Sequence, residues 1–590
     1  MRFLHTDTAR QDEVSWKASG LAIPFFQYCF IAFFPFKTLP MRSKFITLLV
    51  AIVVLVPALY IIPGTIAAGV DTSAADGIID ENWDGGNVIF LTEELCNISS
   101  NYRTFRVSGS QGADEAAHFI AERFASYGLQ VTMENFTMPV WNLTDEPALT
   151  IDADGNSSTE GILIGSFNCE SFSKPTPHDG LVDELVSLPL PQAINYDEIG
   201  RRAIDRQAWD NINISGKVLL IGREVRWSTG WEGVFKEKLL AQPPAAVIYH
   251  YHYPWMSYAQ QSSQSSSGGL PLGEMGPIFW NLNIPVGSVN YSDGQLLVRT
   301  TMDGGLVNMS VPSVITQGTH RNVVADVRTE GSPSKLVLFG AHYDTVLSEG
   351  YVDNSAGVAA VLETARMVQE AVDAGELNLK YGMRFVAFAG EEMGMAGSLH
   401  YVSMHRDEMK DQVASIIADS IGSSDLKVTL AGSDGDVDLN FVADEACGRL
   451  GIARAYQDLA GSDHYAFMFP NWMSNELNSA WGKDLDIGRG LESTSTMCVY
   501  SEPLTMYDNP GSEANGRIHT SLDSREAVEA GEWIEEQDLI DQAQVYALMA
   551  LYSGIGIYEP NYDYLPYVIV LVAVTLIIAF FMLRRWRIDT

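Results

Sequence analysis

Histidine and acidic side chains recur in this sequence directly after short apolar runs that are typical of β-strands. His342 and Asp344 follow the run 335–341, and Glu391 and Glu392 follow the run 384–390. Three further residues occupy comparable positions before a helix, after a strand and in a turn: Asp353, Asp419 and His519. Because the carboxyl ends of parallel strands meet at one edge of a sheet, we expect these side chains to converge there.

Imidazoles and carboxylates gathered at one edge suit zinc ions. A spare carboxylate can bridge two ions, and two ions about 3.5–4 Å apart can activate water and clamp a tetrahedral intermediate. Adjacent side chains in an extended segment point opposite ways, so one of Glu391 and Glu392 can bind metal while the other acts as a general base. Each fragment alone also fits an ordinary polar turn. Their joint order predicts a hydrolytic metal site.

The elements that would position these residues alternate along the chain. Predicted strands cover 322–327, 335–344, 383–392 and 412–420, and predicted helices cover 354–373, 394–409 and 523–553. A helix at 110–127 followed by a strand precedes them. This alternation predicts an α/β fold, a three-layer α/β/α sandwich with a mostly parallel mixed sheet.

The ordered motifs AHYD, DNSAG, AGEE, IAD and IHT resemble the co-catalytic di-zinc exopeptidases of metallopeptidase clan MH. This group includes aminopeptidase Y, bacterial leucyl-type aminopeptidases and glutamate carboxypeptidases. The resemblance covers about 320–555, together with the helix at 110–127. It implies a peptide substrate and two Zn²⁺ cofactors.

The resemblance also implies a role for each residue. One zinc would take His342 and Asp419, the other Glu392 and His519, and Asp353 would bridge them. Glu391 would be the general base, and Asp344 would fix the ring of His342 through its other nitrogen. His464, in GSDHYAF (461–467), is interpreted as a supporting or structural residue near the site, and a direct role as a metal ligand is the alternative.

One position departs from the family pattern. Many members carry Tyr immediately before the last histidine ligand, where it helps to hold the oxyanion, and this chain has Ile518 there. Another donor could take that role, turnover could be slower, or the specificity could differ.

An insert is predicted to interrupt the peptidase domain. Residues 85–150 and 316–556 are assigned to the peptidase. The segment 151–315 resembles a β-rich protease-associated domain in its strands at 216–223, 245–251 and 284–290. His250 and His252 are interpreted as strand residues, not as metal ligands.

The two ends of the sequence have the composition of membrane segments. Residues 564–583 contain no charged residue, are long enough to span a bilayer, and precede a basic tail at 584–590. Residues 41–70 resemble a signal peptide or signal anchor, and 1–40 are an uncertain leader with a second apolar stretch. Sequons for N-glycosylation begin at Asn97, Asn135, Asn142, Asn156, Asn213, Asn290 and Asn308. These features predict a cell-membrane location with the peptidase domain outside the cell.

Composition and missing motifs exclude several classes of protein. The formal net charge of −37 argues against a nucleic-acid partner. No GxSxG elbow or P-loop occurs, and no CxxC pair suggests a zinc knot. Four cysteines lie outside the leader, Cys96, Cys169, Cys447 and Cys498, and these allow either two disulfides or free buried thiols.

The first functional hypothesis is a membrane-anchored extracellular aminopeptidase acting on peptides. A glutamate-carboxypeptidase-like enzyme is an alternative, but it needs a basic cluster for the terminal carboxylate, and Lys and Arg are scarce. A non-catalytic receptor ectodomain and a single-zinc cyclase-like transferase of the same fold are also retained. The oligomeric state stays open, and a dimer is compatible with the sequence.

Overall fold

The protein was analysed as a computed structural model. The structure describes residues 71–152, 161–188, 194–196, 202–222, 231–250, 282–302, 304–329, 334–423, 425–429, 438–457, 459, 461–481, 493–501, 518–530 and 534–557. The predicted leader, signal segment, membrane segment and basic tail all lie outside the described residues, and so does His252. Within the described ranges, no helix is long and apolar enough to cross a membrane.

An eight-stranded mixed sheet forms the centre of the peptidase region, with the strand order β1-β12-β14-β13-β15-β18-β16-β17. Its middle strands β14 (Gly382–Phe388), β13 (Leu336–His342), β15 (Gln412–Ala418) and β18 (Thr496–Tyr500) run parallel. Two long strands, β1 (Gln130–Leu143) and β12 (Ser313–Asp326), form an antiparallel edge. The short strands β16 (Leu426–Val428) and β17 (Arg454–Tyr456) complete the other edge.

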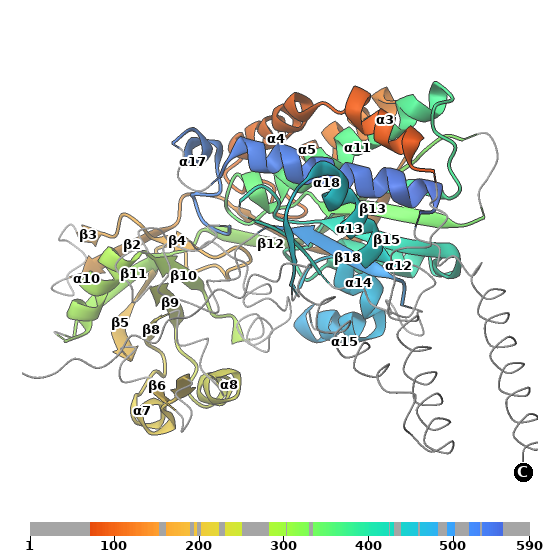
Figure 1. Cartoon of the computed structure of the whole chain (residues 1–590). Coiled ribbons are helices and arrows are strands. Elements are labelled where there is room, and N and C mark those ends of the chain that lie inside the picture. The colour runs from red at the N-terminus through yellow and green to blue at the C-terminus, as the bar shows by residue number, and fades with distance from the viewer. Residues whose placement is uncertain are drawn as a thin grey trace, which may run out of the picture. The chain divides into compact units, whose positions relative to one another are not determined.

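Helices cover both faces of this sheet (Figure 1). One layer contains α4 (Gly85–Ser100), α5 (Gln111–Ser126), α11 (Gly357–Asp373) and α18 (Glu536–Ile555), with α3 (Ser73–Asn82) and α13 (Leu439–Leu450) packed against α18. The other layer contains α12 (Ala396–Met404), α14 (His464–Met468) and α15 (Pro470–Trp481). Strand β13 is buried along nearly its whole length, as expected for a central parallel strand covered on both sides.

Local sequence explains where the helices begin and end. The side chain of Ser110 caps α5 by accepting a hydrogen bond from the backbone N–H of Ala113, 3.3 Å away. Gly128 follows the helix with a φ of +96°, a conformation that glycine adopts readily. The predicted helix at 523–553 is wrong as a single element. It forms two helices, α17 (Arg525–Glu529) and α18, and the sequence between them contains Gly531.

A second eight-stranded sheet has the order β3-β2-β11-β5-β8-β9-β10-β4. It lies in the predicted insert except for the first residues of β2, which precede residue 151. The predicted strands at 216–223, 245–251 and 284–290 correspond to β8 (Val218–Gly222), β9 (Ala246–His250) and β10 (Val286–Val289), which run parallel. The other strands are β2 (Ala148–Asp152), β3 (Ile162–Leu163), β4 (Asn168–Cys169), β5 (Leu181–Leu188) and β11 (Leu306–Ser310). A separate pair, β6 (Ile194–Tyr196) and β7 (Arg202–Ile204), and the helices α7 (Arg206–Asn211), α8 (Trp231–Ala241) and α10 (Tyr291–Met302) complete this region. The likeness to a protease-associated domain stays a prediction.

The α/β prediction is confirmed as a mixed α/β fold with two sheets. The four cysteines Cys96, Cys169, Cys447 and Cys498 are buried free thiols, so of the two alternatives left open by the sequence the structure has the one without disulfides. His250 is buried at the end of β9, as expected for a strand residue.

Candidate metal centre

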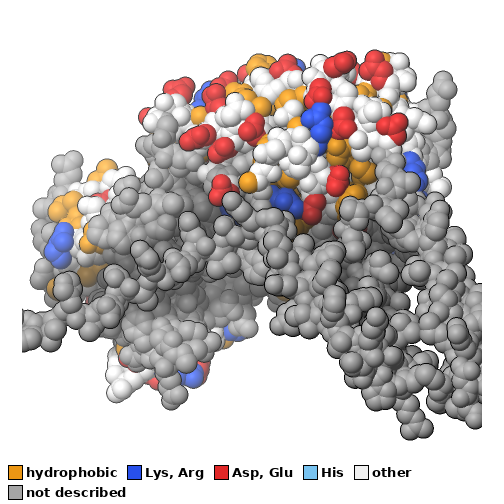
Figure 2. Space-filling view, in the orientation of Figure 1, with side chains coloured by type: hydrophobic (Ala, Val, Ile, Leu, Met, Phe, Trp, Pro, Cys, Tyr) orange, Lys and Arg blue, Asp and Glu red, His pale blue; other side chains and the backbone are white. Residues whose placement is uncertain are grey.

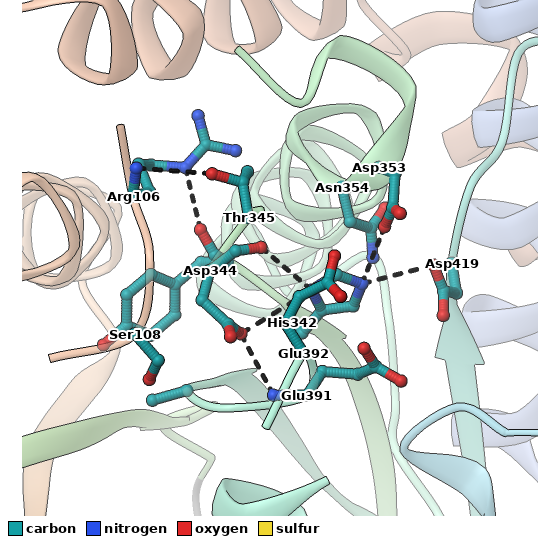
Figure 3. A network of polar contacts seen from close by, with 12 residues as sticks. Arg106, Ser108, His342, Asp344, Thr345, Asp353, Asn354, Glu391, Glu392 and Asp419 are labelled. Carbon is teal, nitrogen blue, oxygen red and sulfur yellow. Dashed lines mark hydrogen bonds and ion pairs between the residues drawn. The ribbon is translucent and has the colours of Figure 1, made fainter. Parts of the chain in front are cut away.

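His342 is the last residue of strand β13, at the carboxyl end of the central parallel strands, and its imidazole is fully buried. The Nε2 atom of His342 lies 3.1 Å from Oδ1 of Asp353 and 3.3 Å from Oδ1 of Asp419. Asp419 directly follows β15, the neighbouring parallel strand. Figure 3 shows His342 between Asp344 on one side and Asp353 and Asp419 on the other.

Asp353 lies on the irregular segment Tyr351–Ala356, which leads into α11. Its second oxygen, Oδ2, lies 3.0 Å from Nε2 of His519, and the same nitrogen lies 2.9 Å from Oε1 of Glu392. Asp353 therefore directs one carboxylate oxygen toward each histidine. The ligand atoms form two groups that share Asp353, and within each group they lie within 4.8 Å of one another.

The carboxylates and imidazoles at this centre shift one another's pKa. Burial alone would lower the pKa of His342, but Asp419, Asp344 and Asp353 outweigh it and raise that pKa well above its ordinary value. The pKa of His519 is raised in the same way, against burial, by Glu392 and Asp353. Burial would raise the pKa of Asp353, but its contacts with the two histidines lower it.

The segment that carries Asp353 is fixed by its neighbour Asn354. The side chain of Asn354 donates to the carbonyl of Ala418 and accepts from the backbone N–H of Gly357, at 2.9 and 3.0 Å. A Cβ at Gly357 would lie 2.3 Å from Oδ1 of Asn354, so only glycine permits this approach. The Asp353 segment is therefore tied directly to the end of β15, next to Asp419. The peptide bond between Asp353 and Asn354 is cis.

Glu391 and Glu392 follow β14 and are both buried. Glu392 faces His519, whereas Glu391 belongs to neither ligand group among the described residues. Burial raises the pKa of Glu391 well above its ordinary value, and repulsion from Glu392 adds to this, although His342 opposes it. The two adjacent carboxylates thus have different surroundings.

Asp344 lies at the other ring nitrogen of His342, on the side of the ring predicted for it. The Nδ1 atom of His342 lies 3.1 Å from the backbone oxygen of Asp344, and its carboxylate oxygen Oδ1 is more distant, at 3.7 Å. That Oδ1 accepts a hydrogen bond from the backbone N–H of Glu391, at 3.1 Å. Asp344 therefore contacts the imidazole through its backbone oxygen and its carboxylate, and the carboxylate also anchors the backbone of Glu391, the residue predicted to be the base.

The donor set fits two zinc ions. Each group combines one imidazole nitrogen with carboxylate oxygens, which are ordinary zinc ligands, and the shared aspartate offers an oxygen to each. Asp353, Glu392 and Asp419 are all at most 7% exposed. So many buried carboxylates require positive charge nearby, and in the described part of the chain the two imidazoles supply only part of it.

The GSDHYAF segment also lies at this centre. His464 is fully buried but belongs to neither ligand group in the described part of the chain, and burial lowers its pKa to about 4. Its neighbour Asp463 was missed by the sequence analysis. Burial and repulsion from Asp419 and Asp344 raise the pKa of the Asp463 carboxyl to about 7, against the effect of His342. Ile518 packs against the hydrophobic core.

Two further charged residues border the centre and were not predicted. Arg106 is fully buried and donates to backbone oxygens near Asp344. Asp523, in the same turn as His519, accepts from the backbone N–H of Asp353. The sequence offered a faint signal for Asp523, because it follows His519 by four residues in IHTSLDS, but none for Arg106.

The chain is similar in sequence to known peptidases. The profile of Peptidase family M28 matches residues 322–540. Aminopeptidase YwaD of Bacillus subtilis is 24% identical over 322 residues, which are 54% of this chain and 59% of that protein. A protein named probable lipoprotein aminopeptidase LpqL, of Mycobacterium tuberculosis, is 27% identical over 307 residues, 52% of each chain. The chain thus spans only about half the length of the curated relatives it matches.

Solved structures share the fold. A Peptidase M28 precursor from Shewanella amazonensis aligns with a TM-score of 0.55 at 16% identity, over 82% of this chain and 96% of that one. The zinc aminopeptidase BSAP from Bacillus subtilis aligns with a TM-score of 0.53 at 20% identity, over 80% and 95%. The match at 322–540 includes the ordered motifs and all the residues of the two ligand groups. Residues 322–540 of this chain therefore match the model of Peptidase family M28.

Proposed function

We propose that this protein is a two-zinc aminopeptidase that removes N-terminal residues from peptides. The observation that carries the proposal is the pair of ligand groups that share Asp353, with Glu391 held beside them. His342 and Asp419 would hold one zinc, Glu392 and His519 the other, and Asp353 both. The relatives named as aminopeptidases support the choice of substrate class.

Bound zinc ions polarise the scissile carbonyl and lower the pKa of the attacking water. Glu391 accepts the proton of that water and passes it to the leaving amine. Its burial and raised pKa suit both steps, because a carboxylate with a raised pKa is a stronger base and, once protonated, remains a usable acid near neutral pH. Asp344 holds the Glu391 backbone, and so limits where its side chain can reach.

The location proposed for the enzyme is the cell membrane, with the peptidase domain outside the cell. The apolar segment 564–583, followed by basic residues, supports a membrane anchor. Fractionation of cells that produce the full chain tests this proposal. Recovery in the membrane fraction after alkaline carbonate, with the peptidase domain degraded by protease added to intact cells, is the expected result. Recovery in the soluble fraction contradicts it.

Hydrolysis by the full chain tests the activity. Aminoacyl-anilides with a free amine, their N-acetylated counterparts and N-blocked dipeptides are offered to the zinc-loaded protein, to the chelated protein and to Glu391→Gln. We expect cleavage of free-amine substrates alone, loss on chelation and recovery with zinc. Glu391→Gln should lower kcat by about 10²- to 10⁴-fold while zinc remains bound.

The control is Glu408→Gln, which removes an exposed carboxylate that belongs to neither ligand group in the described part of the chain and should leave kcat unchanged. Cleavage of N-blocked dipeptides would make the protein a carboxypeptidase. If zinc binds and none of these substrates is hydrolysed, a non-catalytic receptor becomes the better interpretation.

A further inference from the structure

Arg106 is a buried cation that bonds mainly to backbone oxygens and hydroxyls. Its guanidinium donates to the carbonyls of Tyr343 (2.8 Å), Glu349 (3.1 Å) and Leu95 (2.8 Å), and to the hydroxyl of Ser355 (2.8 Å). Its side chain is fully buried, and burial lowers its pKa while leaving the guanidinium charged. Arg106 thus bonds to both ends of segment 343–355, which carries Asp344 and Asp353.

The backbone of Arg106 bonds to this segment as well. Its N–H donates to Oγ1 of Thr345, at 3.3 Å, and its carbonyl accepts from the N–H of Thr345, at 3.2 Å. Figure 3 shows Arg106 beside Thr345, beyond Asp344 from His342. The planar, multi-donor guanidinium reaches oxygen atoms that lie far apart along the chain, which a lysine ammonium cannot reproduce from one position.

Asp523 binds the same segment through amide groups. Its carboxylate accepts from the backbone N–H of Val352 (2.7 Å) and of Asp353 (3.2 Å), and its backbone carbonyl accepts from Gly350 (3.1 Å). Asp523 is fully buried and lies four residues after His519. It therefore links the turn that carries His519 to the segment that carries Asp353.

Arg106 and Asp523 act on opposite groups of one short segment. The guanidinium of Arg106 donates to the carbonyls of residues 343 and 349. The carboxylate of Asp523 accepts from the N–H groups of residues 352 and 353. Together they satisfy polar backbone groups that would otherwise be buried without partners in an irregular segment. The position of the Asp353 carboxylate depends on that backbone, and both ligand groups depend on Asp353.

We propose that Arg106 and Asp523 are paired positioning residues that fix the backbone of segment 343–355 and thereby hold Asp353 where it can serve both metal ions. The proposal rests on the proposed function in so far as the ligand groups bind metal. Neither residue lies in a ligand group within the described part of the chain, and Arg106 comes from outside the matched family region.

The test compares Arg106→Lys and Asp523→Asn with the full-chain protein. Binding of Co²⁺ is followed by its visible absorption spectrum and by equilibrium dialysis, and unfolding is measured with and without the metal. We expect each variant to bind Co²⁺ about 10- to 100-fold more weakly, with an altered spectrum. Each should also lower the unfolding midpoint more in the loaded than in the metal-free protein. Arg103→Lys is the matched control, because Arg103 precedes Arg106 by only three residues but pairs with Glu146 at the surface.

Unaltered Co²⁺ affinity and spectrum in folded Arg106→Lys and Asp523→Asn would overturn the proposal, since a purely structural role destabilises loaded and metal-free protein equally. If both variants fail to fold, the proposal is tested with Ser355→Ala. It removes one acceptor of Arg106 and should weaken Co²⁺ binding by about 3- to 10-fold, and unaltered binding overturns the proposal. Failure of the unmodified protein to bind Co²⁺ contradicts the proposed function itself. Metal binding without hydrolysis contradicts only the activity.

Discussion

At the scale of single residues, the shared aspartate is the feature on which the centre depends. Asp353 offers one oxygen to the group of His342 and the other to the group of His519. Glu392 and Asp419 each serve only one group. The five ligand positions are therefore not equivalent. A substitution at Asp353 should affect both metal ions, whereas a substitution at another ligand should affect only one.

The first prediction concerns metal stoichiometry. Glu392→Gln should leave one tightly bound zinc per chain, because the group of His342, Asp353 and Asp419 stays complete. Asp353→Asn should weaken both sites, because an amide is a poor zinc ligand and each ion loses a carboxylate. The measurement is elemental analysis of zinc per chain after dialysis against a weak chelator, with Glu408→Gln as the control. Equal loss in both variants would contradict the shared role of Asp353.

At the scale of elements, most of what positions the centre could be predicted from sequence. The strand ends that carry His342, Glu391 and Asp419 follow continuous apolar runs, which identify central parallel strands without a structure. The edge strands were harder to predict from sequence, because many of their side chains face outward and interrupt the apolar run. The 14-residue pair β1 and β12 was seen only as fragments.

Two of the residues that the sequence analysis missed, Arg106 and Asp523, act through backbone groups. Arg106 and Asp523 bond to carbonyls and N–H groups of a segment remote from Arg106 in sequence, and such contacts leave no spacing pattern to detect. Asp344 shows the same limit. Its position at the other ring nitrogen of His342 was predicted, but the bond of its carboxylate to the backbone of Glu391 was not. Side-chain chemistry is readable from sequence, whereas backbone partners depend on the folded chain.

The second prediction concerns the start of α5. Ser110→Ala removes the N-cap of this helix, which packs against β1 and β12, and should lower the free energy of unfolding by about 1 kcal/mol. Ser126→Ala is the control at the other end of the same helix, where the hydroxyl is exposed, and should change stability by less than about 0.5 kcal/mol. Urea unfolding measures both. Similar losses in the two variants would mean that the cap contributes nothing specific.

The third prediction concerns the contact between α12 and β1. His405 follows α12, and its Nε2 lies 2.7 Å from Glu134 on β1, while Nδ1 lies 3.1 Å from Glu408. Burial and the nearby Arg384 oppose protonation, but Glu134 and Glu408 outweigh them and raise the pKa of His405. A raised pKa means that the stabilisation is complete below about pH 6.5, the ordinary pKa of histidine, and is lost as pH rises through the folded-state pKa.

His405→Gln should therefore lower the unfolding midpoint most at about pH 6, and the difference from the unmodified protein should shrink toward pH 9. Thermal unfolding of the metal-free protein across this range measures it, so that the metal ligands do not contribute through bound ions. His118→Gln, at an exposed position on α5, is the control. A difference that is constant with pH would show that the ion pair with Glu134 does not contribute.

At the scale of the whole molecule, the dominant property is negative charge. The chain carries 74 Asp and Glu residues against 37 Lys and Arg residues. Figure 2 shows acidic side chains spread over the helical face that includes α3, α4 and α18, with few basic ones between them. Exposed acidic residues on the helices of this layer include Glu81 on α3, Glu93 on α4 and Glu122 on α5. Repulsion between such charges destabilises the compact state and is relieved when the chain expands.

The fourth prediction follows from this repulsion. Raising KCl from 0.1 to 1 M shortens the screening length from about 10 to about 3 Å, so the unfolding midpoint of the metal-free protein should rise. Salt also screens surface ion pairs such as that of Arg206 with Glu237, but each of these contributes at most about 1 kcal/mol. In one-to-one pairs, the 37 Lys and Arg residues could pair with only half of the 74 acidic residues. The triple variant Glu81→Gln, Glu93→Gln and Glu122→Gln should be more stable at low salt and gain less from KCl. Three glutamine substitutions that leave the salt dependence unchanged would show that KCl acts through something other than the charge of this face.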